Sequence, residues 1–350
     1  MTAAARRARL EPLLESARTL SDAASERGRR GRERLVASTG LSSAGVDFAL
    51  QRCLEGEPTE AELDALLQST AEAPSAHVLL SANVFVAAHR AIAIALAASK
   101  VVHVRASRRE PEMADLLLAG APGSFQLQAE LKPQPGDHLW AYGNDDTLRS
   151  VARSLAPGVL LHAHGSGFGL GVIAGRPSDA MLEGLLSSFA EDITLFDQRG
   201  CLSPRALLVT AGPELARDVA RELAAQLAAI ELRVPRGRLE PHEAAEISAY
   251  RDTASFVGEL FPAGLGFVSV GASERVVLAP AGRNLHVLPS TDITKSLGDL
   301  AAFLTSCAIA GDSELCGALE RALPGARFCQ FGHMQRPPLD GPVDRRKRQL

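Results

Sequence analysis

The chain has 350 residues, enough for two domains of ordinary size, and its 46% hydrophobic and 22% charged residues are typical of a soluble globular protein. Aromatic residues make up only 4%, so we expect a core of Ala, Leu and Val, which favours helices packed on a parallel sheet over a β-sandwich. The formal net charge of −4 gives no general electrostatic argument for binding nucleic acid.

Local features of the chain exclude several further classes. The basic runs at 29–34 and 345–348 lie near the ends, where such runs are usually solvated, so no nucleic-acid partner is expected. Residues 1–9 are rich in Ala and Arg, but no apolar stretch follows, and the longest apolar run, 91–99, is too short to cross a bilayer. We therefore expect neither a signal peptide nor a membrane span.

The five cysteines are odd in number, and no two of them have CxxC spacing. This argues against a disulfide framework and against a zinc site built from cysteines, so no metal site is expected. Free thiols fit a reducing, cytoplasmic location. The sequence leaves open whether the chain forms a homo-oligomer.

The pattern of apolar residues predicts three parts. Residues 1–75 form a helical N-terminal segment, with a helix-capping pair at Thr59 and Glu62. From residue 76, short apolar runs alternate with helical stretches, which is the β-α-β signature of a parallel nucleotide-binding sheet. The expected strands are 77–80, 101–104, 138–142 and 159–163, and the expected helices are 84–98, 110–118 and 145–155.

A second alternation of expected strands and helices follows residue 200. Strands are expected at 205–210, 267–270, 275–278 and 285–288, and helices at 213–230 and 297–309. We therefore expect a cofactor-binding domain at 76–195 and a catalytic domain at 196–319, with 320–350 packing back onto the first. A cleft between two such domains is a common place for a cofactor and a substrate to meet.

Cys201 differs from the other cysteines in its surroundings. A cysteine in a helical Ala/Leu context, such as Cys307 or Cys316, is usually a small buried hydrophobe. Cys201 instead lies in a turn, with Gly200 before it and Ser203-Pro204 after it. A thiol in such a turn can be exposed and activated by nearby backbone N–H groups, so Cys201 is the candidate nucleophile.

The segment from Asp197 to Pro204, Asp-Gln-x-x-Cys-Leu-Ser-Pro, resembles the active-site segment of the LuxC family of bacterial fatty-acyl-CoA reductases. That family consists of reductive members of the aldehyde dehydrogenase superfamily. Gly332 to Pro338 also resembles a segment near the end of these reductases, although the tail that follows differs. The resemblance covers about residues 77–338 and implies two α/β domains, a Rossmann-like cofactor domain and a catalytic domain.

Asn83 is the second candidate catalytic residue. It lies between an expected strand and an Ala-rich helix, where asparagine commonly serves as an N-cap. The resemblance implies another role, because the superfamily places an asparagine at such a junction to donate to the developing oxyanion. Asn83 and the backbone N–H of Cys201 would then form the oxyanion hole.

The remaining candidates concern the cofactor. Arg105, Ser107 and Arg108 follow a strand, and ligands bind outside the carboxyl ends of strands in a doubly wound sheet. In the superfamily the basic residue matching Arg105 lies against the adenosine ribose, and NAD-preferring members often carry an acid at the position of Arg108. A cation there suits a 2′-phosphate, so the resemblance favours NADPH. Two glycine turns after strands provide Gly143, Gly165 and Ser166, and either turn suits a pyrophosphate at a helix N-terminus.

The resemblance implies NADPH-dependent reduction of an acyl-CoA, or an acyl-carrier thioester, to an aldehyde through a Cys201 thioacyl-enzyme. Hydrolytic aldehyde dehydrogenases carry a glutamate base that activates water, but 165–175, the matching region here, contains no carboxylate. Two alternatives stay open: an acyl-phosphate reductase resembling γ-glutamyl phosphate reductase, and a non-catalytic scaffold with the same fold.

Overall fold

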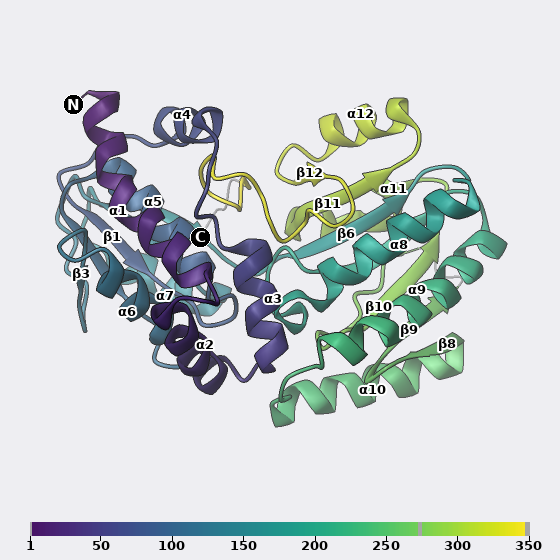
Figure 1. The fold of residues 1–350 in the computed structure, drawn as a ribbon. Coiled ribbons are helices and arrows are strands. Elements are labelled where there is room, and N and C mark those ends of the chain that lie inside the picture. Colours follow the sequence, from purple (N-terminus) through teal and green to yellow (C-terminus); the bar gives the residue numbers. More distant parts are fainter. Residues whose placement is uncertain (1, 272–274, 347–350) are drawn as a thin grey trace.

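Two β-sheets, each covered by helices on both faces, form the framework of the chain (Figure 1). This computed structural model describes residues 2–271 and 275–346. Within these ranges, none of the helices combines the length and the apolar character that crossing a membrane requires. The mixed α/β fold with parallel sheets confirms the expected fold class.

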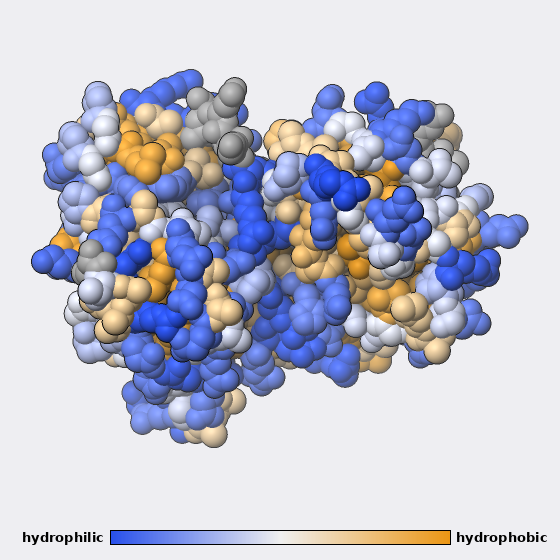
Figure 2. All heavy atoms as spheres, turned by 90° about the horizontal axis from the view of Figure 1, so that it is seen from above, coloured by the Kyte–Doolittle hydropathy of each residue, from blue (hydrophilic) through white to orange (hydrophobic). Residues whose placement is uncertain are grey.

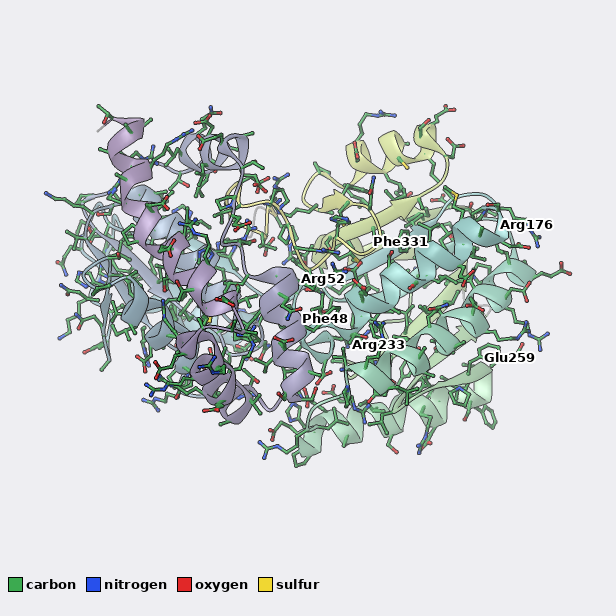
Figure 3. All side chains as sticks on the ribbon, viewed as in Figure 1. Phe48, Arg52, Arg176, Arg233, Glu259 and Phe331 are labelled. Carbon is green, nitrogen blue, oxygen red and sulfur yellow. The ribbon has the colours of Figure 1, made fainter. Side chains whose placement is uncertain are left out.

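Four N-terminal helices precede the first strand. They are α1 (Ala3–Ser21), α2 (Glu26–Thr39), α3 (Ser43–Cys53) and α4 (Glu60–Ser69). The predicted capping box at Thr59 and Glu62 is present at the start of α4. Helix α3 lies between the two halves, and Figure 3 shows Phe48 and Arg52 on its side toward the second sheet. Arg52 forms an ion pair with Glu191, which fixes α3 against the second half.

The first sheet has the strand order β3-β2-β1-β4-β5, with all strands parallel. Because the order reverses between β1 and β4, the loops after these two strands flank a topological switch point, where ligands bind in such sheets. Helices α1, α5 and α6 cover one face, and α7 covers the other. The elements are β1 (Ala76–Leu79), α5 (Ala87–Ala98), β2 (Val102–Arg105), α6 (Glu112–Gly120), β3 (Gln126–Leu127), β4 (His138–Tyr142), α7 (Asp145–Ser154) and β5 (Leu160–His164).

The second sheet has the order β12-β11-β6-β7-β10-β9-β8, parallel except for the β8–β9 pair. Its strands are β6 (Phe168–Ile173), β7 (Pro204–Val209), β8 (Gly258–Ala263), β9 (Gly266–Gly271), β10 (Leu285–Pro289), β11 (Leu304–Ala310) and β12 (Arg327–Cys329). Its helices are α8 (Asp179–Thr194), α9 (Pro213–Arg233), α10 (Pro241–Val257), α11 (Ile293–Leu297) and α12 (Ser313–Ala322), with 3₁₀ turns η1 (Leu195–Gln198) and η2 (Gly298–Phe303).

The helix expected at 84–98 is present but begins at Ala87. Two other sequence expectations for individual elements were wrong. The helix expected at 297–309 is a short 3₁₀ turn followed by β11, because the apolar run after Phe303 is buried between β6 and β12, where a continuous apolar strand fits. The strand expected at 275–278 is irregular backbone.

The chain passes from the first sheet to the second between His164 and Phe168. Strand β6 pairs with β7 and β11, so residues 168–195 lie with the second sheet. The sequence pattern had predicted these residues to be part of the first domain. We accordingly propose 165–167 as the boundary between the two α/β domains.

The C-terminal segment after β12 returns to the first half of the molecule (Figure 1). The buried guanidinium of Arg90, on α5, donates to the carbonyl groups of Pro337 (2.6 Å), Pro338 (2.9 Å) and Gly341 (2.7 Å). Ser69 donates to the carbonyl of Asp340 at 3.1 Å. These contacts hold the segment between the two halves, beside the site described next.

Candidate active site

A cavity of about 520 Å³ lies where the loops at the carboxyl ends of the first sheet meet the turn before β7. Six residues singled out from the sequence line it together: Asn83, Ser107, Gly143, Gly165, Ser166 and Cys201. Viewed from above, the seam between the two halves is largely hydrophilic (Figure 2). The structure therefore brings the candidate catalytic and cofactor residues of both halves to one place.

The turn that leads to Cys201 has an unusual backbone. Phe196, Asp197 and Gln198 have φ angles of 56°, 49° and 62°, in the left-handed region that L-amino acids seldom adopt. Such residues cost of order 1–3 kcal/mol each and persist only where surrounding contacts impose them. The side chains of Asp197 and Gln198 make those contacts.

Asp197 is buried and holds the turn through three groups. One carboxylate oxygen accepts from Arg283 Nη2 at 2.8 Å, the other accepts from the backbone N–H of Gly237 at 3.0 Å, and the Asp197 carbonyl accepts from Gly282 N–H at 3.0 Å. Arg283 also pairs with Glu231 at 2.8 Å and donates to the carbonyl of Val234 at 2.5 Å. The buried charges are thus paired and hydrogen-bonded, as buried ions must be.

Gln198 ties the same turn to two strands. Its side-chain oxygen accepts from Asn284 N–H at 2.8 Å, and its side-chain nitrogen donates at 2.8 Å to the carbonyls of Pro204 and Asn284. Pro204 begins β7 and Asn284 immediately precedes β10. The sequence assigns neither Asp197 nor Gln198 a chemical step, and the contacts of both side chains order the turn.

Cys201 lies half-buried in a short turn that is closed on both sides. Ser203 N–H donates to the carbonyl of Gly200 at 3.1 Å, and Gly200 N–H donates to the Ser203 hydroxyl at 3.2 Å. A Cβ on Gly200 would lie 2.8 Å from Val84 Cγ2. The backbone before Cys201 therefore packs closely on the loop that carries Asn83, and only glycine fits there without a shift.

The other cysteines have a different character. Burial raises the pKa of Cys53, Cys307 and Cys316 above the ordinary thiol value and raises that of Cys329 to about 12. Cys53 also lines the cavity, but its burial keeps the thiol protonated at neutral pH. This leaves Cys201 as the better candidate nucleophile in the cavity.

Asn83 belongs to the irregular loop between β1 and α5. The N-cap position of α5 is occupied by Val86, with no side-chain cap, so Asn83 is not the helix cap that its type and place suggested. Asn83 is exposed and lines the same cavity as Cys201. It is thus available to a ligand in that cavity.

The cofactor candidates separate into two groups. Ser107 lines the cavity, whereas Arg105 and Arg108 do not, and the exposed Arg109 lines it instead. Gly143 leads into α7, whose N-cap Asn144 accepts from Thr147 N–H at 2.8 Å. Gly165 and Ser166 lead into a strand, β6, so a helix N-terminus follows only one of the two glycine turns.

Two carboxylates line the cavity, and both are paired with arginine. Burial opposes ionisation of Glu55, but Arg90 and His89 outweigh it and hold the pKa of this carboxyl below its usual value. Asp344 pairs with Arg346 at 2.7 Å, and this contact likewise outweighs burial and lowers the pKa of Asp344. A carboxylate with a lowered pKa is a weak base, so neither is well suited to activate water.

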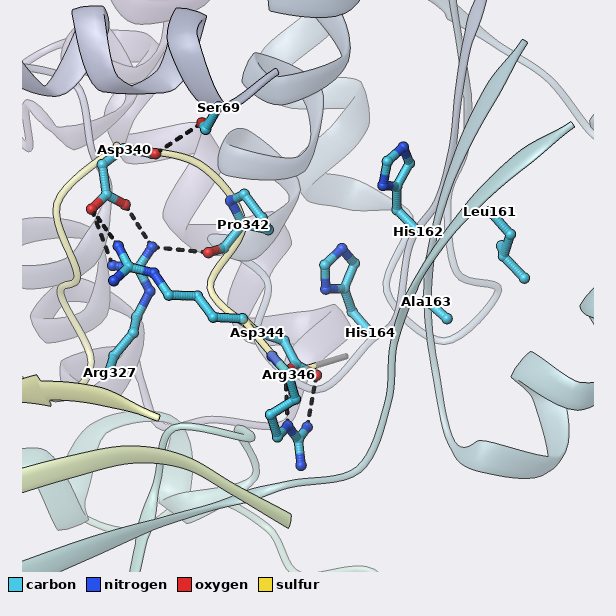
Figure 4. Close-up of a pocket in the computed structure, with 11 residues that line it drawn as sticks. Ser69, Leu161, His162, Ala163, His164, Arg327, Asp340, Pro342, Asp344 and Arg346 are labelled. Carbon is cyan, nitrogen blue, oxygen red and sulfur yellow. Dashed lines mark hydrogen bonds and ion pairs between the residues drawn. The ribbon is translucent and has the colours of Figure 1, made fainter. Parts of the chain in front are cut away.

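A second cavity, of about 840 Å³, adjoins the first at His164 and Asp344 (Figure 4). Strand β5 forms one wall, with His162 and His164, and the C-terminal segment forms the other. His164 stacks on Tyr142, with ring centroids 4.6 Å apart. Across the cavity, Arg327 pairs with Asp340 at 2.5 Å.

The C-terminal segment reaches the site through Asp192, at the end of α8. Its carboxylate accepts from Gly332 N–H at 2.7 Å and from Met334 N–H at 3.1 Å. Gln335, which lines the cavity, donates to Ser203 at 3.0 Å. Burial raises the pKa of Asp192 to about 7, although the two N–H donors and Arg336 favour its charged form.

The model of the LuxC acyl-CoA reductase family matches residues 121–344, more than half of the chain. The chain belongs to the LuxC acyl-CoA reductase family. It is therefore an oxidoreductase. The matched span of this LuxC-family chain includes Cys201, Gly143, Gly165 and Ser166, whereas Asn83, Arg105, Ser107 and Arg108 precede it.

The fold is that of the aldehyde dehydrogenases. Similar solved structures include an oxidoreductase from Marinobacter aquaeolei, with a TM-score of 0.71 and 11% identity over 92% of this chain and 78% of that one. A NAD-dependent benzaldehyde dehydrogenase from Corynebacterium glutamicum has a TM-score of 0.68 and 13% identity over 92% and 80%. A γ-glutamyl-γ-aminobutyraldehyde dehydrogenase from Burkholderia cenocepacia has a TM-score of 0.67 and 15% identity over 93% and 76%. Among curated proteins, none matches this LuxC-family sequence.

Replacing Asp197 is expected to loosen the turn that carries Cys201. Asp197→Ala leaves Arg283 buried with one carboxylate instead of two, and breaking a buried pair typically costs about 3–5 kcal/mol. Denaturant unfolding measures this loss, and the rate of Cys201 alkylation should change with it. In the exposed pair of Arg217 and Glu259, Glu259→Ala should cost less than about 1 kcal/mol. Equal losses in the two variants would contradict the role of Asp197.

Asp192 is expected to make stability depend on pH. Between about pH 4 and 7 the folded chain holds a proton on Asp192 that the unfolded chain, with a carboxyl pKa of 3.8, has released. This contribution to the free energy of unfolding therefore falls as pH rises across that window, by up to about 1.4 kcal/mol per pH unit. In urea unfolding, Asp192→Asn should flatten this dependence, whereas Asp179→Asn, an exposed change on the same helix, should not. Parallel profiles for wild type and Asp192→Asn would contradict the assignment.

Proposed function

We propose that the chain reduces an acyl thioester, such as an acyl-CoA, to an aldehyde with NADPH. The Cys201 thiolate attacks the thioester carbonyl, and the carrier thiolate leaves, which gives an acyl group on Cys201. Transfer of hydride to that carbonyl carbon gives a hemithioacetal anion, which collapses to aldehyde and the Cys201 thiolate. The observation that best supports this proposal is that Cys201, on its constrained turn, lines the same cavity as Asn83 and the loops of the first sheet.

Asn83 and the backbone N–H of Cys201 stabilise the oxyanion in both steps. Each step places negative charge on the former carbonyl oxygen, and preorganised N–H donors are worth most where that charge develops. The close packing of Gly200 on Val84 supports this assignment, because it fixes the loop of Asn83 against the turn of Cys201. Asn83 carries no capping role that would occupy its side chain.

The cavity favours reduction over hydrolysis. An acyl-cysteine is hydrolysed when a base activates water beside it. The two carboxylates of this cavity, Glu55 and Asp344, are held in their charged forms by arginines and have lowered pKa values. Transfer of the acyl group to water should therefore be slow, and the acyl-enzyme should persist until the reduced cofactor is available.

The residues around the switch point fit a nicotinamide dinucleotide. When bound, NADPH supplies the hydride. Ser107 and Gly143 follow the carboxyl ends of β2 and β4. The backbone of Gly143 lies close to Thr147, since a Cβ on Gly143 would be 3.3 Å from that side chain. Arg105, Arg108 and Arg109 provide positive charge at the end of β2, and Gly165 and Ser166 line the opposite side of the same cavity. The chain thus binds and orients the cofactor with its loops.

The direct test follows oxidation of NADPH by absorbance when acyl-CoAs of several chain lengths are added, with aldehyde identified as product. The wild-type chain should form one aldehyde for each NADPH consumed. Cys201→Ser and Cys201→Ala should abolish this reaction, whereas Cys316→Ala, a change in another half-buried cysteine, should leave it unchanged. Wild-type turnover by Cys201→Ala would show that another group is the nucleophile.

Asn83→Ala is expected to slow turnover by roughly 10²–10³, the usual effect of losing one oxyanion donor. Because Asn83 does not cap α5, thermal stability should change little. Turnover assays and thermal unfolding of the same preparation measure the two effects. A large loss of stability with turnover unchanged would assign Asn83 a structural role instead.

Positive charge at the end of β2 should set the preference for NADPH over NADH. A charge-assisted contact with the 2′-phosphate is worth about 1.5–3 kcal/mol, so removing it should weaken NADPH binding more than tenfold. We expect this for Arg108→Glu or Arg109→Glu, with the larger effect at Arg109 because it lines the cavity. The affinity for NADH should change little in these variants. Equal affinity of the wild type for the two cofactors would contradict the proposal.

A further inference from the structure

Arg205 stands apart from the other arginines that line the active-site cavity. Arg90 pairs with Glu55 and Arg199 pairs with Glu243, while Arg109 is exposed at the end of β2. Arg205 is half-buried, yet among the described residues no carboxylate lies within 4.0 Å of its guanidinium. Among the described residues, the cavity therefore contains a partly desolvated positive charge that is not paired with a carboxylate.

The backbone and the side chain of Arg205 are held in place. Its Nε donates to the carbonyl of Ala279, and Ala279 N–H donates back to the Arg205 carbonyl at 3.1 Å. Within the described part of the chain, the two Nη groups have no hydrogen-bond acceptor. A guanidinium presents its two Nη groups as a planar fork, and this part binds carboxylates and phosphates best. In Arg205 this part is therefore available to bind an anion.

Arg205 is also close to the reacting thiol along the chain. It follows Cys201 by four residues, and the turn from Gly200 to Ser203 shortens that path below the roughly 14 Å of a fully extended chain. Burial lowers the pKa of Arg205 to about 10, so it remains charged at neutral pH. Glu246 and Tyr250 of α10 act on it only at longer range.

We propose that Arg205 is the anion-recognition residue for the thioester substrate. Its Nη groups bind a substrate anion, which is either a carboxylate at the far end of the acyl group or a phosphate of coenzyme A. This inference rests on the proposed function, because it assigns the substrate to the cavity of Cys201. It makes Arg205 a specificity-determining residue rather than a participant in the chemical steps.

The test compares three thioesters in the absence of cofactor: butanoyl-CoA, S-butanoyl-N-acetylcysteamine, which is uncharged, and S-glutaryl-N-acetylcysteamine, which carries only a carboxylate. The rate of acyl transfer to Cys201 is followed by intact mass for wild type, Arg205→Met and Arg205→Lys. Arg233→Met is the control, because Arg233 is exposed at the last residue of α9, labelled in Figure 3, and does not line the cavity.

If Arg205 binds a coenzyme A phosphate, Arg205→Met should slow acylation by butanoyl-CoA about tenfold or more and leave both N-acetylcysteamine thioesters unchanged. If it binds an acyl carboxylate, only the glutaryl thioester should be slowed. Arg205→Lys should recover part of either loss, and Arg233→Met should change neither. An equal effect on all three thioesters, or less than about a twofold effect on both charged ones, would overturn the proposal.

Binding of free coenzyme A and of glutarate by calorimetry separates this inference from the proposed function. If no thioester acylates the wild type, the proposed function fails. The proposed anion site is then still supported if Arg205→Met weakens binding of coenzyme A or glutarate about tenfold. It is overturned if each ligand binds wild type and variant equally, or if neither ligand binds to either protein.

Discussion

Three consecutive residues before Cys201 hold a left-handed backbone, and the buried ion pair of Asp197 and Arg283 offsets the cost of that conformation. Arg283 belongs to the chain just before β10, so the pair joins the turn to an interior strand of the second sheet. Gln198 adds hydrogen bonds to the starts of β7 and β10. The direction in which the chain enters Cys201 is therefore set by buried polar contacts.

The first sheet supplies the other half of the site. The carboxyl ends of its strands face the turn of Cys201, and the loop of Asn83 packs on Gly200. The C-terminal segment closes this arrangement from a third side, because Arg90 holds its carbonyl groups and Gln335 contacts Ser203. Three separate parts of the chain thus fix one cavity, and such preorganisation is what the proposed acyl transfer would need.

Much of this arrangement follows from local sequence patterns. Alternating strands and helices predict where the loops at the carboxyl ends lie, and Gly200 with Ser203-Pro204 predicts the turn of Cys201. The partners of Asp197 and Gln198 could not be predicted, because Arg283 and Asn284 are distant in sequence and carry no local signal. The strand β11 was mistaken for a helix because its apolar run fits both structures, and its burial between two strands decides the outcome.

The account depends on Cys201 being the group that takes up the acyl chain. Incubating the chain with an acyl-CoA in the absence of cofactor, followed by intact mass and peptide mapping, tests this most directly. We predict one acyl group per chain, located on Cys201 and stable to water until NADPH is added. An acyl group on Cys53 or another residue, or an unmodified chain that still forms aldehyde with NADPH, would contradict the account.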